Sequence, residues 1–171
     1  EYEVRPASAD ASFRRYFRVS ANGATCIVMD APPDKEDMRP FIEIARRLHH
    51  LGLNVPEVLE QDLARGYLLL TDLGQQMCLP QLNESTVERL YGEALGALVV
   101  LQAGILTDPG FLPEYDAVLL RRELELFREW YLGRHLGLTL SPAQTAVLDE
   151  AFTLLVRSAL AQPRVWVHRD Y

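Results

Sequence analysis

The segment Val165-Trp166-Val167-His168-Arg169-Asp170-Tyr171 (VWVHRDY) decides how the rest of the chain is interpreted. Its apolar first residues predict a buried strand, and this strand runs directly into His-Arg-Asp. That order is typical of the opening of a catalytic loop in which the aspartate accepts a hydrogen bond from a substrate hydroxyl. Asp170 is therefore the candidate catalytic base. The alternative is an ordinary strand end that carries charged residues, because the tripeptide alone is a weak signal.

His-Arg-Asp is the start of the kinase pattern H-R-D-x-x-x-x-N, in which the aspartate orients the acceptor oxygen toward the transferring phosphoryl group. Only one residue follows Asp170, so the asparagine of that pattern is not in this sequence. We therefore expect the chain to be an excerpt that is open at both ends. No metal ligand is expected within it, and the metal ligands are expected beyond Tyr171.

The remaining elements follow in the order that a kinase requires. The first half predicts β-β-α-β-β, and helices take over after residue 74. The predicted class is therefore α+β, a two-lobed protein-kinase-like fold with a β-rich N-terminal lobe at 1–73 and a partial helical C-terminal lobe at 74–171. The predicted strands are 13–19 and 25–29, joined by a turn at 21–24, and 55–59 and 66–71. The first predicted helix is 38–51 and is ended by Gly52. Later helices begin near Val87, cover 116–132, and begin at the capping box Ser141-Pro142-Ala143-Gln144.

Composition and charge limit the class of protein. The 171 residues are 49% apolar, which is enough for a sizeable core. Seventeen basic and 24 acidic side chains give a net charge of −7, which argues against non-specific nucleic-acid binding. Cys26 and Cys78 are far apart and predict reduced thiols in a cytoplasmic protein. We expect no membrane partner, because no apolar run reaches spanning length, and the oligomeric state stays open.

The segment around the first predicted strand is the candidate phosphate-covering loop. Ser12, Phe13, Arg14 and Arg15 stand where backbone N–H groups, a hydroxyl and guanidinium groups could meet phosphate oxygens. The glycines usual for such a loop are missing. The alternative is an amphipathic edge strand with solvated arginines.

Four further residues are candidates for nucleotide binding. Met29 stands where a kinase strand carries its lysine, and Glu43 lies on the helix that would pair with that lysine. The lysine itself is missing, so another cation would have to reach the phosphates. The backbone of Asp72 and Leu73, after the buried strand 66–71, could bind an adenine as a hinge. An exposed helix carboxylate and a simple strand-to-turn junction are the alternatives for Glu43 and for the hinge.

The acceptor side is predicted from the segment ELELFREWYLGRH. Glu123 and Trp130 could accept sugar hydroxyls and cover a sugar ring, and Arg169 next to the catalytic aspartate is placed with them as a substrate-binding residue. The alternative for Trp130 is packing within the helical core.

Several segments together resemble the aminoglycoside phosphotransferase and choline kinase superfamily. The resemblance is closest to its bacterial anomeric kinases for N-acetylmuramate and N-acetylglucosamine. It extends in order over nearly the whole chain, through SADASFRRYFRV (8–19), CIVMDAPPDKED (26–37), NVPEVL (54–59), GYLLLTDLG (66–74), ELELFREWYL (123–132) and VWVHRDY (165–171).

The resemblance implies an ATP- and Mg²⁺-dependent kinase whose partners are a nucleotide and a small-molecule sugar. It implies that Asp170 is the base, that 12–15 is the phosphate loop and that Asp72 and Leu73 form the hinge. The implied reaction phosphorylates the anomeric hydroxyl of an N-acetylated amino sugar in cell-wall recycling. Two alternatives remain: an aminoglycoside or other small-alcohol kinase, and an inactive kinase-like binding protein, which the missing lysine would allow.

Overall fold

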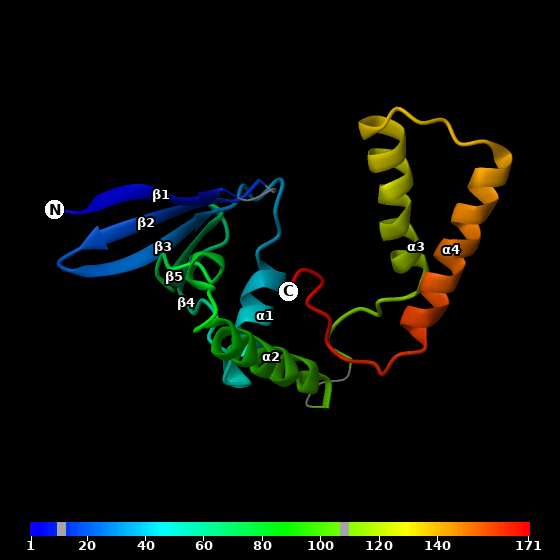
Figure 1. Ribbon diagram of the computed structural model, residues 1–171. Helices are drawn as coiled ribbons and strands as arrows, with labels where there is room; N and C mark the ends of the chain where they lie inside the picture. The colour runs from blue at the N-terminus through cyan, green and yellow to red at the C-terminus, as the bar shows by residue number, and fades with distance from the viewer. Residues whose placement is uncertain (10–12, 107–109) are drawn as a thin grey trace. The chain divides into compact units, whose positions relative to one another are not determined.

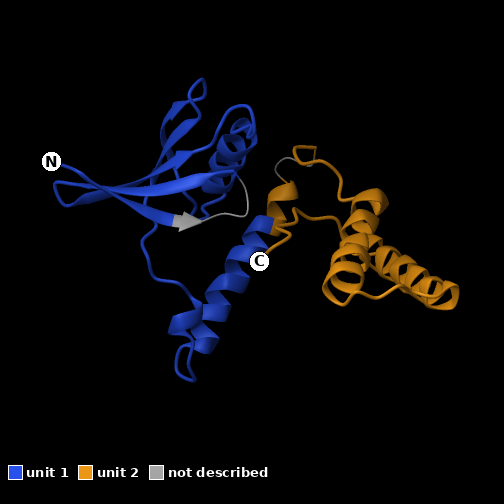
Figure 2. Ribbon diagram, turned by 90° about the horizontal axis from the view of Figure 1, so that it is seen from above, with its two compact units in different colours: residues 1–101 blue, residues 102–171 orange. Residues whose placement is uncertain are grey.

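The computed structural model describes residues 1–9, 13–106 and 110–171. It divides into two compact units, Glu1–Leu101 and Gln102–Tyr171 (Figure 2). The lobe boundary expected from the sequence, between residues 73 and 74, is a different division and stays a prediction.

The first unit contains a five-stranded antiparallel sheet (Figure 1). The strand order is β1-β2-β3-β5-β4, so β5 lies between β3 and β4 although it follows β4 in the sequence. A tight turn at Asn22-Gly23 joins β2 to β3, and both turn residues have positive φ, as two-residue hairpin turns require. The strands are β1 (Glu3–Ala9), β2 (Arg15–Ala21), β3 (Ala24–Asp30), β4 (Val58–Asp62) and β5 (Tyr67–Thr71).

The edge strand β1 was not predicted from the sequence. Pro6 and the charged residues around it weaken the strand pattern there. An edge strand tolerates a proline, because one side of its backbone has no strand partner, and the pairing with β2 is irregular between Pro6 and Ser8. The strand predicted at 55–59 begins only at Val58, two residues after Pro56.

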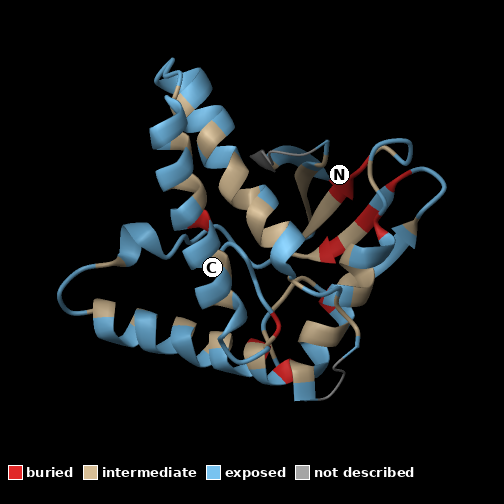
Figure 3. Ribbon diagram, turned by 90° about the vertical axis from the view of Figure 1, so that its right-hand side faces the viewer, coloured by how far each residue is buried: buried red, intermediate tan, exposed pale blue. Residues whose placement is uncertain are grey.

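The core of this unit lies between one face of the sheet and helix α1 (Arg39–His50). Figure 3 shows buried positions on the strands and a few on the helices and connecting segments, whereas most helical positions are intermediate or exposed. Gly52 ends α1 with φ +81°, as the sequence predicted. The buried side chains are Met29, Ala31, Met38, Leu68 and Leu70, and Tyr16, Ile27, Phe41, Ile42 and Val58 pack against them.

The turn before β5 approaches the end of β3 very closely. The N–H of Ala31 donates to the carbonyl of Gly66 at 2.8 Å, and Gly66 has φ +83°. A Cβ atom on Gly66 would lie only 2.1 Å from the Ala31 carbonyl oxygen. Glycine is therefore required at this position both by conformation and by space.

Helix α2 (Val87–Ala103) follows the short 3₁₀ turn η1 (Leu79–Gln81) and leads into η2 (Gly104–Leu106). The span Val87–Leu106 is long and apolar enough to cross a membrane by length and composition, with a mean hydropathy of 1.3. No apolar run of spanning length was expected from the sequence. Length and composition alone are weak evidence for a membrane segment, because core helices of soluble proteins share them.

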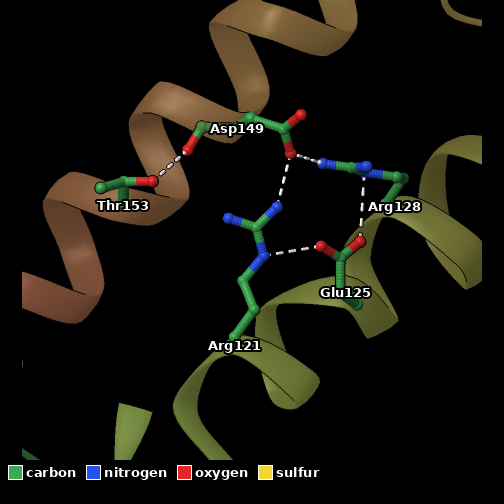
Figure 4. Close-up of polar contacts among 5 residues, drawn as sticks. All are labelled: Arg121, Glu125, Arg128, Asp149 and Thr153. Atoms are coloured by element: carbon green, nitrogen blue, oxygen red, sulfur yellow. Dashed lines mark hydrogen bonds and ion pairs between the residues drawn. The ribbon is translucent and has the colours of Figure 1, made fainter. Parts of the chain in front are cut away.

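In the second unit, α3 (Ala117–Leu126) and α4 (Pro142–Leu160) lie side by side and antiparallel (Figure 1). Asp149 on α4 accepts from both Arg121 and Arg128, and Glu125 pairs with the same two arginines (Figure 4). Both guanidinium groups also lie over the buried ring of Phe152, at 5.1 and 5.5 Å from its centroid. The pKa of Asp149 is lowered by Arg128 and Arg121, so the network is charged at neutral pH.

The end of the α3 segment differs from the prediction. A continuous helix was expected over 116–132, but the α-helix ends at Leu126 and a π-helix, η3 (Phe127–His135), follows. The rings of Phe127, Tyr131 and His135 stack along it, with centroids 5.3 and 5.6 Å apart. At the start of α4, Ser141 and Gln144 form the predicted capping box with Pro142 at the first helical position.

Candidate active site

The predicted phosphate-covering loop is described only in part, because Ser12 lies outside the described residues. The backbone N–H of Phe13 donates to Glu36 Oε1 at 3.3 Å, and the Phe13 side chain is exposed. Arg15 pairs with Asp30 across β2 and β3, and most of its side chain is exposed. Both groups therefore already interact with carboxylates here, and phosphate binding by 12–15, including Arg14, stays a prediction.

The two residues predicted at the kinase lysine–glutamate pair lie in different surroundings. Met29 has no exposed surface and belongs to the core. Glu43 accepts from Arg46 and Arg47, which lie three and four residues further along α1, at 2.7 Å each. These bonds lower the pKa of Glu43, with Arg46 as the larger cause. In the described structure Glu43 is thus neutralised by arginines of its own helix.

The predicted hinge is held by an ion pair that the sequence analysis did not foresee. Arg18 on β2 donates to both carboxylate oxygens of Asp72, at 2.6 and 2.8 Å, and to the carbonyl of Gly74 at 3.0 Å. Asp72 also accepts from the N–H of Gly74. The two side chains are only 16% and 5% exposed, so this is a largely buried, bidentate pair. Leu73, between these anchored residues, is exposed.

The ion pair sets the charge state of the hinge aspartate. The hydrogen bonds of Arg18 hold the pKa of Asp72 far below its usual range, although burial opposes them. The side chain of Asp72 is therefore engaged within the protein, and nucleotide binding by the backbone at 72–73 stays a prediction.

We expect the contribution of Asp72 to stability to depend on pH. Its pKa is lower in the folded than in the unfolded state, so the stabilisation is complete above about pH 4 and is lost as the pH falls through the folded-state value. Chemical denaturation of the complete protein should show Asp72→Asn clearly less stable than the wild type at pH 7 and nearly equal to it at strongly acidic pH. Asp34→Asn, which removes an exposed carboxylate, is the control. A difference that stays constant with pH would contradict the assignment.

The segment that leads to the predicted catalytic aspartate is not a strand, which corrects the sequence prediction. Residues 163–168 have no regular secondary structure, because no strand of the described residues pairs with them. Trp166 is nevertheless buried, and its ring packs at 5.8 Å from that of Phe111. The apolar pattern therefore predicted the burial of Trp166 correctly, but Val167 is exposed and the backbone is not a strand.

Beyond Trp166 the chain emerges to the surface. Asp170 is exposed, and its N–H donates to His168 Nδ1 at 3.3 Å. The His168 ring meets the Tyr171 ring edge-on at 5.3 Å. The carboxylate of the candidate base is thus presented to solvent by a short, locally bonded turn.

Two predicted acceptor-side residues contact one another. Glu123 on α3 accepts from Arg169 through Oε1 and from the hydroxyl of Tyr115 through Oε2. The Arg169 guanidinium also lies 5.9 Å from the centroid of the Tyr115 ring. Tyr115 could not be predicted from the sequence, because a single tyrosine in a loop has no pattern that indicates its partner.

Trp130 is half exposed on the π-helix and does not belong to a core. The Arg134 guanidinium lies 3.9 Å above its ring, and Arg134 also pairs with Glu129. One face of the indole is therefore covered by a cation. A role in sugar binding stays a prediction.

The described residues do not fit a metal site. Within 1–9, 13–106 and 110–171, no three His, Cys, Asp or Glu side chains are grouped so that they could hold a metal ion. No step proposed below runs through a metal held by these residues.

The chain belongs to the phosphotransferase enzyme family, whose family model matches residues 3–171. This class and the sheet-then-helices order confirm the predicted α+β, protein-kinase-like fold.

Curated relatives narrow the comparison further. The chain is 51% identical to the N-acetylmuramate/N-acetylglucosamine kinase of Pseudomonas aeruginosa, over 99% of this chain and 49% of that protein. It is 50% identical to the protein of that name from Pseudomonas putida, over 96% of this chain and 48% of the relative, and 38% identical to that from Neisseria meningitidis, over 100% and 52%. The chain thus spans about half the length of the curated relatives that it matches.

Proposed function

We propose that the complete protein is an ATP-dependent kinase that phosphorylates the anomeric hydroxyl of an N-acetylated amino sugar such as N-acetylmuramate or N-acetylglucosamine. The observation that carries the proposal is Asp170 in an exposed His-Arg-Asp turn, in a chain of the phosphotransferase family whose relatives bear that name. We also propose that the protein acts on this substrate in the cytoplasm, as part of cell-wall recycling.

The proposed chemistry at Asp170 is general-base catalysis. Its carboxylate accepts the proton of the anomeric hydroxyl and orients the oxygen toward the γ-phosphoryl group of ATP. Mg²⁺ supplies charge neutralisation of the phosphates in kinases of this chemistry. Because the described residues do not fit a metal site, we assign its ligands to no residue of this chain.

The nucleotide side of the proposal rests on the hinge. Arg18 and Gly74 fix Asp72 from both sides, which orders the backbone at 72–73 for hydrogen bonds to an adenine edge. β5, the strand before the hinge, is anchored in the core by Leu68 and Leu70, which are buried.

The test is the position of the phosphoryl group on the product. With N-acetylmuramate or N-acetylglucosamine and ATP, phosphorus NMR of the complete protein's product should show a labile anomeric phosphate. The matched methyl glycoside, blocked at O1, should not react. If the glycoside is phosphorylated as fast as the free sugar, the anomeric assignment is wrong. Turnover only with aminoglycosides or choline would support the small-alcohol alternative, and no turnover with any acceptor would support the binding protein.

A further inference from the structure

Arg169, inside the His-Arg-Asp turn, has a backbone conformation that arginine rarely adopts. Its φ is +75°, and among the described residues the only other non-glycine residue with positive φ is Asn22. Every residue with a Cβ is penalised in this region, because that atom comes too close to the backbone. Asparagine offsets the penalty with local hydrogen bonds of its short polar side chain, which arginine does not make. Contacts with other residues must therefore stabilise this conformation of Arg169. The conformation matters for Asp170, because Asp170 is the next residue.

The side chain of Arg169 is held from two sides by residues far from it in the sequence. Glu123 on α3 accepts from its guanidinium, and the Tyr115 ring lies beside it. The Tyr115 hydroxyl donates to the second oxygen of Glu123, so both carboxylate oxygens have a donor. Less than a third of the Glu123 side chain is exposed.

The charge states suit a permanent clamp. The Tyr115 hydroxyl and then Arg169 lower the pKa of Glu123, and Glu123 raises the pKa of Tyr115. Near neutral pH the cluster therefore consists of a carboxylate, a protonated phenol and a guanidinium, which is the combination that makes all of these hydrogen bonds.

We infer that Glu123 and Tyr115 are positioning residues that hold Arg169 in its left-handed conformation and thereby aim Asp170 at the acceptor hydroxyl. This inference rests on the proposed kinase function. It gives Glu123 a role different from the sugar contact predicted from the sequence, because its two oxygens are already engaged within the protein.

The test is a double-mutant cycle between residues 123 and 169 in the complete protein. Glu123→Ala should lower kcat about tenfold, with KM for the sugar and for ATP within about twofold of wild type, because fewer molecules hold Asp170 in position. Glycine adopts positive φ without a clamp. Glu123→Ala should therefore change kcat less than about twofold when it is introduced into Arg169→Gly. Tyr115→Phe, which removes one donor to Glu123, should lower kcat about threefold.

Glu114→Gln is the matched control. Glu114 is next to Tyr115 and pairs with Arg164, so this ion pair joins the same two segments of the chain, but both side chains are mostly exposed. Its loss should leave kcat and KM within about twofold of wild type.

Three results would overturn the inference. A tenfold loss from Glu123→Ala in both backgrounds would show no coupling to residue 169, and a raised sugar KM with unchanged kcat would make Glu123 a sugar ligand. If the wild type phosphorylates no sugar, the proposed function is wrong. The inference about Arg169 is then tested by a crystal structure of the complete Glu123→Ala protein. The inference requires residue 169 to leave the positive-φ region in that variant, and an unchanged φ would contradict it.

Discussion

Asp170→Asn in the complete protein is expected to lower kcat by about 10²- to 10⁴-fold while leaving the affinity for ATP within about twofold of wild type. The asparagine keeps the size of the side chain but cannot accept the proton of the acceptor hydroxyl. In the proposed function the aspartate acts on the acceptor and not on the nucleotide, so binding and turnover should separate. Steady-state kinetics with the sugar and calorimetric titration with ATP measure the two effects.

The control for this substitution is Glu150→Gln, which neutralises an exposed carboxylate on α4. Its kcat should equal that of the wild type. Activity of Asp170→Asn within a few-fold of wild type would refute the assignment of the base, and an equal loss of ATP affinity would place Asp170 on the nucleotide instead.

The second large effect concerns the position where a kinase strand carries its lysine. Met29→Lys is expected to destabilise the complete protein by on the order of 3–5 kcal/mol, because Met29 has no exposed surface and a buried ammonium group loses its hydration. Burial lowers the pKa of such a lysine below its unfolded value of about 10.4, so the loss should shrink as the pH rises toward that value. Chemical denaturation at pH 7 and pH 10 measures both.

Met29→Leu is the matched control, because it conserves volume and apolar character and should cost less than about 1.5 kcal/mol. If Met29→Lys is as stable as Met29→Leu and binds ATP more tightly, residue 29 faces the nucleotide. In that case the lysine position has a binding role, and the core packing around Met29 differs in the complete protein.

Patterns with a strong local cause were predictable from the sequence. The hairpin turn at Asn22-Gly23, the end of α1 at Gly52 and the capping box at Ser141 each depend on a few neighbouring residues, and all three are found. The strand predicted at 25–29 is also found, because β3 is the middle strand of the sheet and pairs with β2 and β5. The family resemblance, carried by the order of many short segments, correctly gave the class.

What the sequence could not give depends on contacts between distant residues. The strand predicted at 165–167 required a partner strand, and the apolar pattern can report burial but not pairing. Arg18 and Asp72 are 54 positions apart, and Glu123 and Arg169 are 46 apart, so no spacing rule connects them. The arginine between Phe17 and Val19 was the available signal for this pair, since a guanidinium that becomes largely buried needs a carboxylate.

The π-helix Phe127–His135 has a consequence for anyone who transfers residue roles between relatives. In a π-helix the hydrogen bonds join residues five apart, as in the bond from the N–H of Leu136 to the carbonyl of Tyr131, and the ion pair Glu129–Arg134 has the same spacing. The wider helix thereby accommodates one inserted residue. A relative that lacks that residue would continue as an ordinary α-helix, and its side chains beyond this point would emerge in other directions. An alignment that is correct letter by letter would then equate Trp130 with a residue that points elsewhere.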